Sequence, residues 1–199
     1  RRQRQMCIRD RFHWTHLELE RYFDIKMLLQ PSTSNEIFRE TNHQLKTLLP
    51  KQLLKDMRVE MLCTTDDPID DLSSHQKISL SLDGPKVFPG FRPDRIFGIE
   101  EENYLDYLDA LTKASGNEIL DLNSLLDALL SRIAFFHENG CRISDHGLEF
   151  TYSSHYTFNE VNAILKNRLL GKIPKEEDKM KFNSCVLFEL FKMYHDFEL

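Results

Sequence analysis

The 199-residue sequence predicts a helix-rich α/β fold in which short parallel strands alternate with helices. Three observations support this prediction: short apolar runs end in polar clusters, longer segments have apolar residues at helical spacing, and Gly or Pro separates successive segments. Hydrophobic residues make up 41% and charged residues 29% of the chain, an ordinary composition for a globular domain. No apolar run approaches the roughly 18 residues of a membrane span, so we expect no integral membrane protein.

The N-terminal half predicts a helix, a strand and a second helix, in this order. Residues 31–49 begin with Ser and Thr capping candidates and continue with apolar residues on one helical face. Residues 59–63 carry apolar side chains at alternate positions, which indicates a strand that ends at the sequence TTDDP. Pro68 suits the first turn of a helix, so we expect the next helix to begin there.

The C-terminal half predicts two further strands and four helices. The strand candidates are KVFPGF, residues 86–91, and CRIS, residues 141–144. Gly116 and Gly140 mark the ends of the first two helices, and Gly171 separates the last two. The expected helices are residues 100–115, 121–138, 159–170 and 176–197. Their Leu and Phe stripes indicate core packing rather than a cofactor site.

The charge of the chain is unevenly distributed. Residues 1–11 contain five Arg and one Asp, a local charge of +4. Because the net charge of the whole chain is −6, the other residues together carry −10. An acidic body argues against nucleic-acid binding. We interpret the basic segment as a non-native tail; a targeting or nucleic-acid-binding arm is the alternative. The four cysteines are widely spaced, which fits reduced thiols and a cytoplasmic protein.

Each strand candidate is followed by a polar cluster. These clusters are TTDD at 64–67, RPD at 92–94 and SDH at 144–146. The carboxyl ends of successive parallel strands meet on one face, where the active sites of α/β barrels are built. Arginine can bind a carboxylate through two hydrogen bonds, and histidine can bind a metal or transfer a proton. The candidate site residues are Asp66, Asp67, Arg92, Asp94, Asp145 and His146.

Each cluster also has a purely structural interpretation. TTDDP could cap the helix expected at Pro68, and RPD could form a turn with an Arg–Asp pair. His146 could be a hydrogen-bonded residue at a strand end. His13 and His16 are spaced i, i+3, but no third ligand accompanies them, which favours a structural or pocket-wall role.

At these positions the chain resembles the uronate isomerases of the amidohydrolase superfamily. The segments that carry the resemblance are HWTHLELERYFDI, LLQPSTSNEIF, TTDDPIDDLSSH, KVFPGFRPDRIFGIE and NGCRISDHGL, in this order. The likeness extends from Phe12 to the C-terminus. Two departures are mild: Phe91 stands where the family usually has Trp, and Gly147 stands where Ala commonly follows the histidine.

The resemblance implies a metal-dependent (β/α)₈ TIM barrel, of which residues 12–199 would form a central part with about three of the eight strands. It implies a bacterial enzyme of sugar-acid catabolism that interconverts D-glucuronate with D-fructuronate, and D-galacturonate with D-tagaturonate. The substrate would be a small uronate. Arg92 and Asp94 would bind it, and Asp66 and Asp67 would line the pocket. Asp145 and His146 would be the catalytic pair.

The resemblance also implies a divalent metal, with zinc expected. His146 is a candidate ligand, whereas the His-x-His pair and the late Asp of the superfamily are missing from this sequence. We therefore expect an incomplete, inactive fragment of a parent isomerase that could form homo-oligomers. Two alternatives remain open: a metal-dependent hydrolase of the same superfamily, and a non-catalytic helical interaction module.

Overall fold

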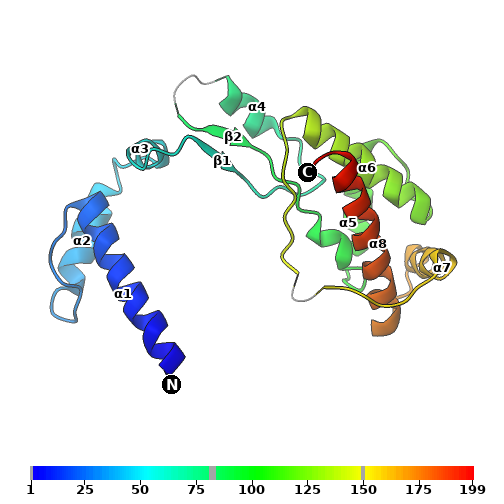
Figure 1. The fold of residues 1–199 in the computed structure, drawn as a ribbon, viewed down its shortest axis with the longest axis horizontal. Coiled ribbons are helices and arrows are strands. Elements are labelled where there is room, and N and C mark those ends of the chain that lie inside the picture. Colours follow the sequence, from blue (N-terminus) through cyan, green and yellow to red (C-terminus); the bar gives the residue numbers. More distant parts are fainter. Residues whose placement is uncertain (1, 81–83, 149–150) are drawn as a thin grey trace. The chain divides into compact units, whose positions relative to one another are not determined.

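The structure is a computed structural model that describes residues 2–80, 84–148 and 151–199, with only the backbone described for residues 2–10. The chain divides into two compact units, Arg1–Glu60 and Met61–Leu199, and helices dominate both of them (Figure 1). None of the described helices is long and apolar enough to cross a membrane.

The first unit contains three helices: α1 (Arg2–Phe23), α2 (Ser34–Gln44) and α3 (Pro50–Asp56). The single helix expected over residues 31–49 is therefore too long. Leu49 is extended, and Pro50 begins a new helix because a proline suits the first helical position. His16 contacts the backbone on two sides: its Nδ1 lies 2.7 Å from the Phe12 carbonyl, and its Nε2 lies 2.8 Å from the amide nitrogen of Leu29.

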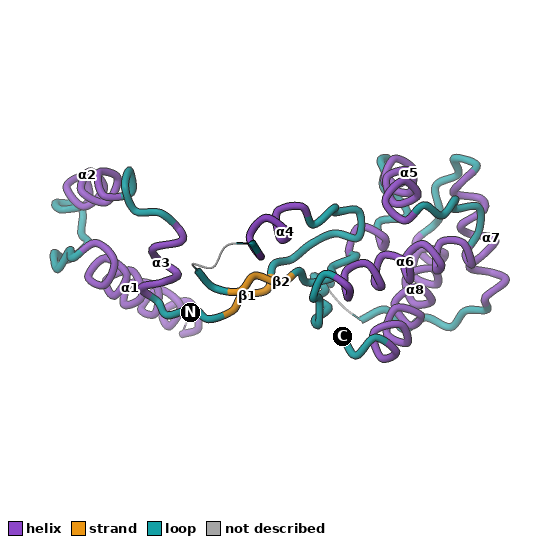
Figure 2. The backbone as a smooth tube through the Cα atoms, turned by 90° about the horizontal axis from the view of Figure 1, so that it is seen from above, coloured by secondary structure: helices purple, strands orange, loops and turns teal. Residues whose placement is uncertain are grey.

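The second unit carries the predicted strands and most of the core. Its elements are β1 (Met61–Cys63), α4 (Ser73–Ser79), β2 (Lys86–Phe88), the 3₁₀ helix η1 (Asp94–Phe97), α5 (Tyr104–Ser115), α6 (Leu122–Glu138), α7 (Phe158–Leu169) and α8 (Glu176–Asp196). Strands β1 and β2 run parallel, with Leu62 opposite Val87 (Figure 2). Two of the three predicted strands are thus confirmed in place, although both are shorter than expected.

The third predicted strand, residues 141–144, is reduced to a single bridge. Gly140 has a φ of 91°, and the Cys141 amide still donates to the Phe136 carbonyl of α6, so the first residue of the predicted strand still belongs to the end of the helix. Only Ser144 pairs, in a parallel bridge with Phe91. The sheet in the described part of the chain therefore has two strands, extended by isolated bridges.

The helix expected to begin at Pro68 starts at Ser73 instead. Residues 67–70 form a turn in which the Asp67 carboxylate accepts a hydrogen bond from the Ile69 amide at 3.1 Å. The capping interpretation of TTDDP is wrong for the same reason, because Asp67 closes this turn and Leu72 occupies the helix N-cap in a left-handed conformation.

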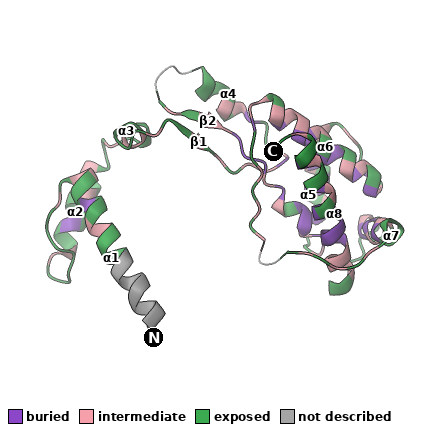
Figure 3. Ribbon diagram, in the orientation of Figure 1, coloured by how far each residue is buried: buried purple, intermediate pink, exposed green. Residues whose placement is uncertain are grey.

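The core of the second unit is formed by α5, α6, α7 and α8 with the segment around η1 (Figure 3). Capping boxes begin α6 at Asp121 and α7 at Thr157, and Gly116 ends α5 with a φ of 74°. Most of the Leu and Phe residues of these helices are buried in one continuous cluster, which confirms their interpretation as core, whereas Phe188 and Phe191 of α8 are exposed. Phe91 joins this cluster and packs edge-on against Phe136, with ring centroids 5.2 Å apart.

Candidate active site

Backbone hydrogen bonds bring the three predicted polar clusters together. The Asp66 amide donates to the Gly90 carbonyl and the Arg92 amide donates to the Asp66 carbonyl, both at 2.9 Å. On the other side, the Phe91 amide donates to Ile143 and the Asp145 amide donates to Phe91, both at 3.0 Å. The clusters at 64–67, 92–94 and 144–146 therefore lie side by side, as the parallel arrangement predicted.

Four of the six predicted residues form one interacting group. The Arg92 Nε donates to Asp94 Oδ2 at 2.8 Å, and it lies 3.6 Å from Asp145 Oδ2. Asp94 Oδ1 lies 3.3 Å from His146 Nδ1. The Arg92 side chain is 35% exposed and that of Asp145 is 49% exposed, so both can meet a molecule from solution. We call Arg92, Asp94, Asp145 and His146 the arginine cluster.

His146 is the least exposed member of the arginine cluster, with 14% of its side chain accessible. Burial lowers the pKa of its imidazole, and the nearby charge of Asp94 opposes that shift. Its Nε2 lies 3.1 Å from the hydroxyl of Tyr194 on α8. Sequence reasoning missed Tyr194, because the apolar stripe around it predicts only a core position.

Asp66 has hydrogen-bond partners of its own. Its Oδ2 accepts from the Thr64 hydroxyl at 2.6 Å and from the Gly90 amide at 3.2 Å. The Thr64 oxygen in turn lies 2.7 Å from Nε2 of His75 on α4. This network ties the end of β1 to α4 and to the end of β2, and sequence reasoning did not anticipate His75.

Asp67 lies apart from both the arginine cluster and the Asp66 network, beside Tyr107 and Arg95. Burial raises the pKa of its carboxyl, while the Ile69 amide and the charge of Arg95 oppose the shift. The Arg95 guanidinium stacks over the Tyr107 ring, 4.4 Å from its centroid. The hydrogen bonds of Asp66 and Asp67 fix the loop after β1. That these two residues line the substrate pocket stays a prediction.

The described residues do not fit a metal ion by themselves. Among them, no group of three His, Cys, Asp or Glu side chains could hold one. Both ring nitrogens of His146 already lie within hydrogen-bonding distance of protein groups, Asp94 and Tyr194. The role of His146 as a ligand therefore stays a prediction.

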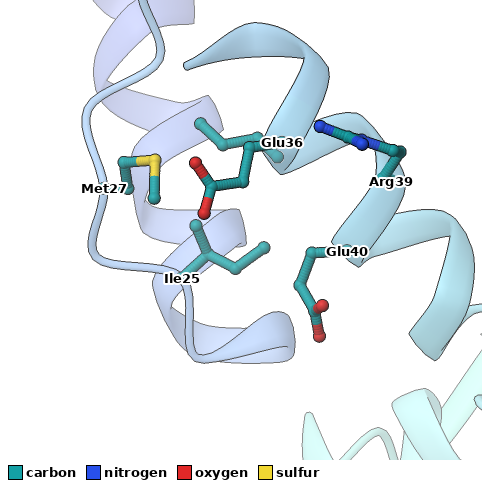
Figure 4. A pocket seen from close by; sticks show the side chains of 6 residues that line it. Ile25, Met27, Glu36, Arg39 and Glu40 are labelled. Carbon is teal, nitrogen blue, oxygen red and sulfur yellow. The ribbon is translucent and has the colours of Figure 1, made fainter.

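Pockets in the described part of the chain also lie away from the arginine cluster. One, of about 320 Å³, lies in the first unit and is lined by Ile25, Met27, Glu36, Ile37, Arg39 and Glu40 (Figure 4). Another, of about 540 Å³, borders the two strands of the second unit and is lined by Met61, Cys63, Phe88, Gly140, Arg142 and Ile143. Neither contains a residue that the sequence predicted for the site.

Comparison with known proteins places these residues in a well-defined group. The family described as glucuronate isomerase matches residues 4–199. Curated uronate isomerases from Flavobacterium johnsoniae and Lachnoclostridium phytofermentans are 41% and 37% identical over 188 and 187 residues, which cover 94% and 92% of the chain. The chain spans about 40% of the length of each relative.

Solved structures agree with this comparison. The crystal structure of a uronate isomerase from Thermotoga maritima matches with a TM-score of 0.85 and 31% identity, covering 93% of this chain and 41% of that one. The glucuronate isomerase from Caulobacter crescentus matches with a TM-score of 0.82 and 25% identity, covering 92% and 38%.

Proposed function

The chain belongs to the glucuronate isomerase family, and we propose on this premise that the whole protein interconverts D-glucuronate with D-fructuronate and D-galacturonate with D-tagaturonate. The observation that carries the proposal is the arginine cluster, which gathers a guanidinium, two carboxylates and an imidazole at the ends of parallel segments. Such a set suits a small, anionic, hydroxylated substrate.

Arg92 is the group that we assign to the substrate carboxylate. Asp94 holds its Nε at 2.8 Å, which fixes the plane of the guanidinium without enclosing it. A guanidinium fixed in this way can bind a carboxylate through two parallel N–H donors. Arg92 Nε lies 3.6 Å from the Asp145 carboxylate. The positive charge of Arg92 therefore also offsets the repulsion between Asp145 and an anionic substrate.

The isomerisation requires removal of a proton from C2, stabilisation of an enediolate, and return of a proton at C1. Asp145 is half-exposed beside Arg92 and is our candidate for the proton transfer. A cation next to the developing oxyanion stabilises it, which is a second role for Arg92. His146 is the second member of the catalytic pair predicted from the sequence. Its two ring nitrogens lie beside Asp94 and Tyr194.

The remaining expectations concern the whole protein. We propose that residues 12–199 form about three strands of a (β/α)₈ barrel, supported by β1, β2 and the bridged segment at Ser144. The described cysteines, Cys63, Cys141 and Cys185, are free thiols, in line with a cytoplasmic enzyme. A divalent metal, zinc, and a homo-oligomeric assembly stay predictions.

The 199-residue chain by itself is expected to show no conversion of glucuronate or galacturonate. About three strands cannot close a barrel, so the site would stay open to water on one side. The measurement is a coupled assay of ketose formation, with the full-length Flavobacterium johnsoniae relative as the positive control. Turnover by the chain alone would contradict this expectation.

A chimaera tests the function directly. In it, residues 12–199 replace the matching segment of the Flavobacterium johnsoniae uronate isomerase, to which the chain is 41% identical. We expect the chimaera to convert glucuronate at a rate within about tenfold of the parent, because the segment carries its own arginine cluster. A chimaera that folds but isomerises neither uronate would sink the proposed function.

A further inference from the structure

We propose that Tyr194 is a positioning residue that fixes the imidazole of His146, and through it the carboxylate of Asp94 and the guanidinium of Arg92. The proposal rests on the proposed function only in assigning Arg92 to the substrate. Its own basis is a continuous set of polar contacts from α8 to η1 and Arg92.

The position of Tyr194 is determined by packing. The residue lies near the C-terminal end of α8, is 5% exposed and belongs to the buried core cluster. Its ring packs edge-on against Phe91, with centroids 6.1 Å apart, and Phe91 is fully buried. A tyrosine held this firmly presents its hydroxyl at a fixed point, 3.1 Å from His146 Nε2.

The hydrogen bonds of Asp94 decide which nitrogen of His146 carries the proton. Asp94 Oδ2 accepts from Arg92 Nε and from the Gly147 amide, both at 2.8 Å, so this carboxylate acts as an acceptor. Its Oδ1 faces His146 Nδ1 at 3.3 Å and therefore favours a proton on Nδ1. The lone pair of a neutral ring then lies on Nε2, where the Tyr194 hydroxyl donates.

The hydroxyl of Tyr194 is suited to a donor role. Burial raises the pKa of the phenol well above its ordinary value, so the hydroxyl keeps its proton at physiological pH. Other groups around the imidazole do not replace this contact: Phe97 and Phe191 present aromatic rings to it, and Asp145 and Arg92 act on it through their charges.

Loss of the hydroxyl would free the ring of His146. Without a donor at Nε2, the ring can exchange between its two flipped orientations and between tautomers, because the final torsion of histidine is only weakly restricted. Asp94 would then lose a fixed neighbour at Oδ1, and the guanidinium plane of Arg92 would be less firmly set. His146 therefore acts through Asp94.

The test is nitrogen NMR of the 199-residue chain labelled with ¹⁵N-histidine, with the His146 signals assigned by their loss in His146→Gln. In the unsubstituted chain we expect a protonated Nδ1 and a hydrogen-bonded, unprotonated Nε2. In Tyr194→Phe the Nε2 resonance should move downfield, towards that of a nitrogen without a donor. Tyr156→Phe is the matched control, because Tyr156 also contacts α8, at Cys185, and should leave His146 unchanged.

A protonated Nε2 in the unsubstituted chain would overturn the proposal, and so would an unchanged Nε2 resonance in Tyr194→Phe. If Tyr194→Phe does not fold, as judged by circular dichroism, the Nε2 resonance of the unsubstituted chain still decides, because the position of an unprotonated nitrogen without a donor there would overturn the proposal. The result is independent of turnover. An inactive chimaera together with an Nε2 resonance that moves in Tyr194→Phe would overturn the proposed function and leave the positioning role of Tyr194 standing.

Discussion

Replacement of Arg132 by methionine is expected to lower the free energy of unfolding of the second unit by about 3 kcal/mol. Arg132 projects from α6, is 6% exposed, and donates from Nε to the Pro68 carbonyl at 2.6 Å. Its Nη1 donates to the Ala114 carbonyl at 2.8 Å, and its Nη2 donates to the Asp70 carbonyl at 2.9 Å. Methionine fills similar space but leaves all three carbonyls without their charged donor.

The loss should be concentrated in the turn after β1. Two of the three acceptors are the carbonyls of Pro68 and Asp70, which lie in the turn of residues 67–70 that directly follows Asp66. Urea unfolding followed by circular dichroism gives the size of the effect, and amide hydrogen exchange at residues 66–72 gives its location.

Arg142→Met is the matched control for this experiment. Arg142 is exposed, and its Nη1 donates to the carbonyls of His137 and Cys141. We expect a loss below about 1 kcal/mol. Equal losses for the two variants would contradict the role assigned to Arg132. Arg132→Lys should resemble Arg132→Met, because one ammonium cannot replace three donors spread over a planar fork.

The second large effect is expected on catalysis. In the chimaera, Arg92→Met should reduce kcat/KM for glucuronate by about a hundredfold or more, because both the carboxylate contact and a cation at the oxyanion are lost. Arg92→Lys should recover only part of the loss, since lysine keeps the charge but cannot replace the fork that Asp94 orients through Nε.

Steady-state kinetics on both uronates measure this effect. Arg142→Met in the chimaera is the control, because it removes another arginine near the segment at Ser144 without touching the arginine cluster. A kcat/KM for Arg92→Met within a few-fold of the unsubstituted chimaera would show that another group binds the substrate carboxylate.

Local sequence patterns predicted much of the fold. Alternating apolar residues located β1, the apolar run KVFPGF located β2, and helical spacing located α5 to α8 with boundaries near Asp121, Gly116 and Gly171. The errors came from local backbone geometry. The end of α6 extends to Cys141, so CRIS pairs only through a bridge at Ser144, and the Asp67 turn displaced the helix start past Pro68.

The site was predicted where it depends on strand ends and missed where it depends on packing. Adjacent parallel segments brought Arg92, Asp94, Asp145 and His146 together, as expected from their places after apolar runs. Tyr194 and Arg132 gave no such signal. Tyr194 contacts a residue 48 positions earlier, and the acceptors of Arg132 are backbone carbonyls, which any sequence supplies.

Phe91 pairs with Asp66 on one side and with Ser144 on the other, and this limits which sequence changes the segment between Phe88 and Arg92 can accept. Gly90 and Arg92 bond to Asp66 while Phe91 bonds to the segment at Ser144, and the Phe91 ring fills the core. One inserted or deleted residue between Phe88 and Arg92 would exchange the two faces, turning the guanidinium towards the core and the aromatic ring towards solvent. A side chain at Gly90 is also excluded, because its Cβ would lie 2.4 Å from the Thr64 carbonyl oxygen. The length of this stretch is therefore as constrained as its composition, and homologous proteins should accommodate insertions elsewhere.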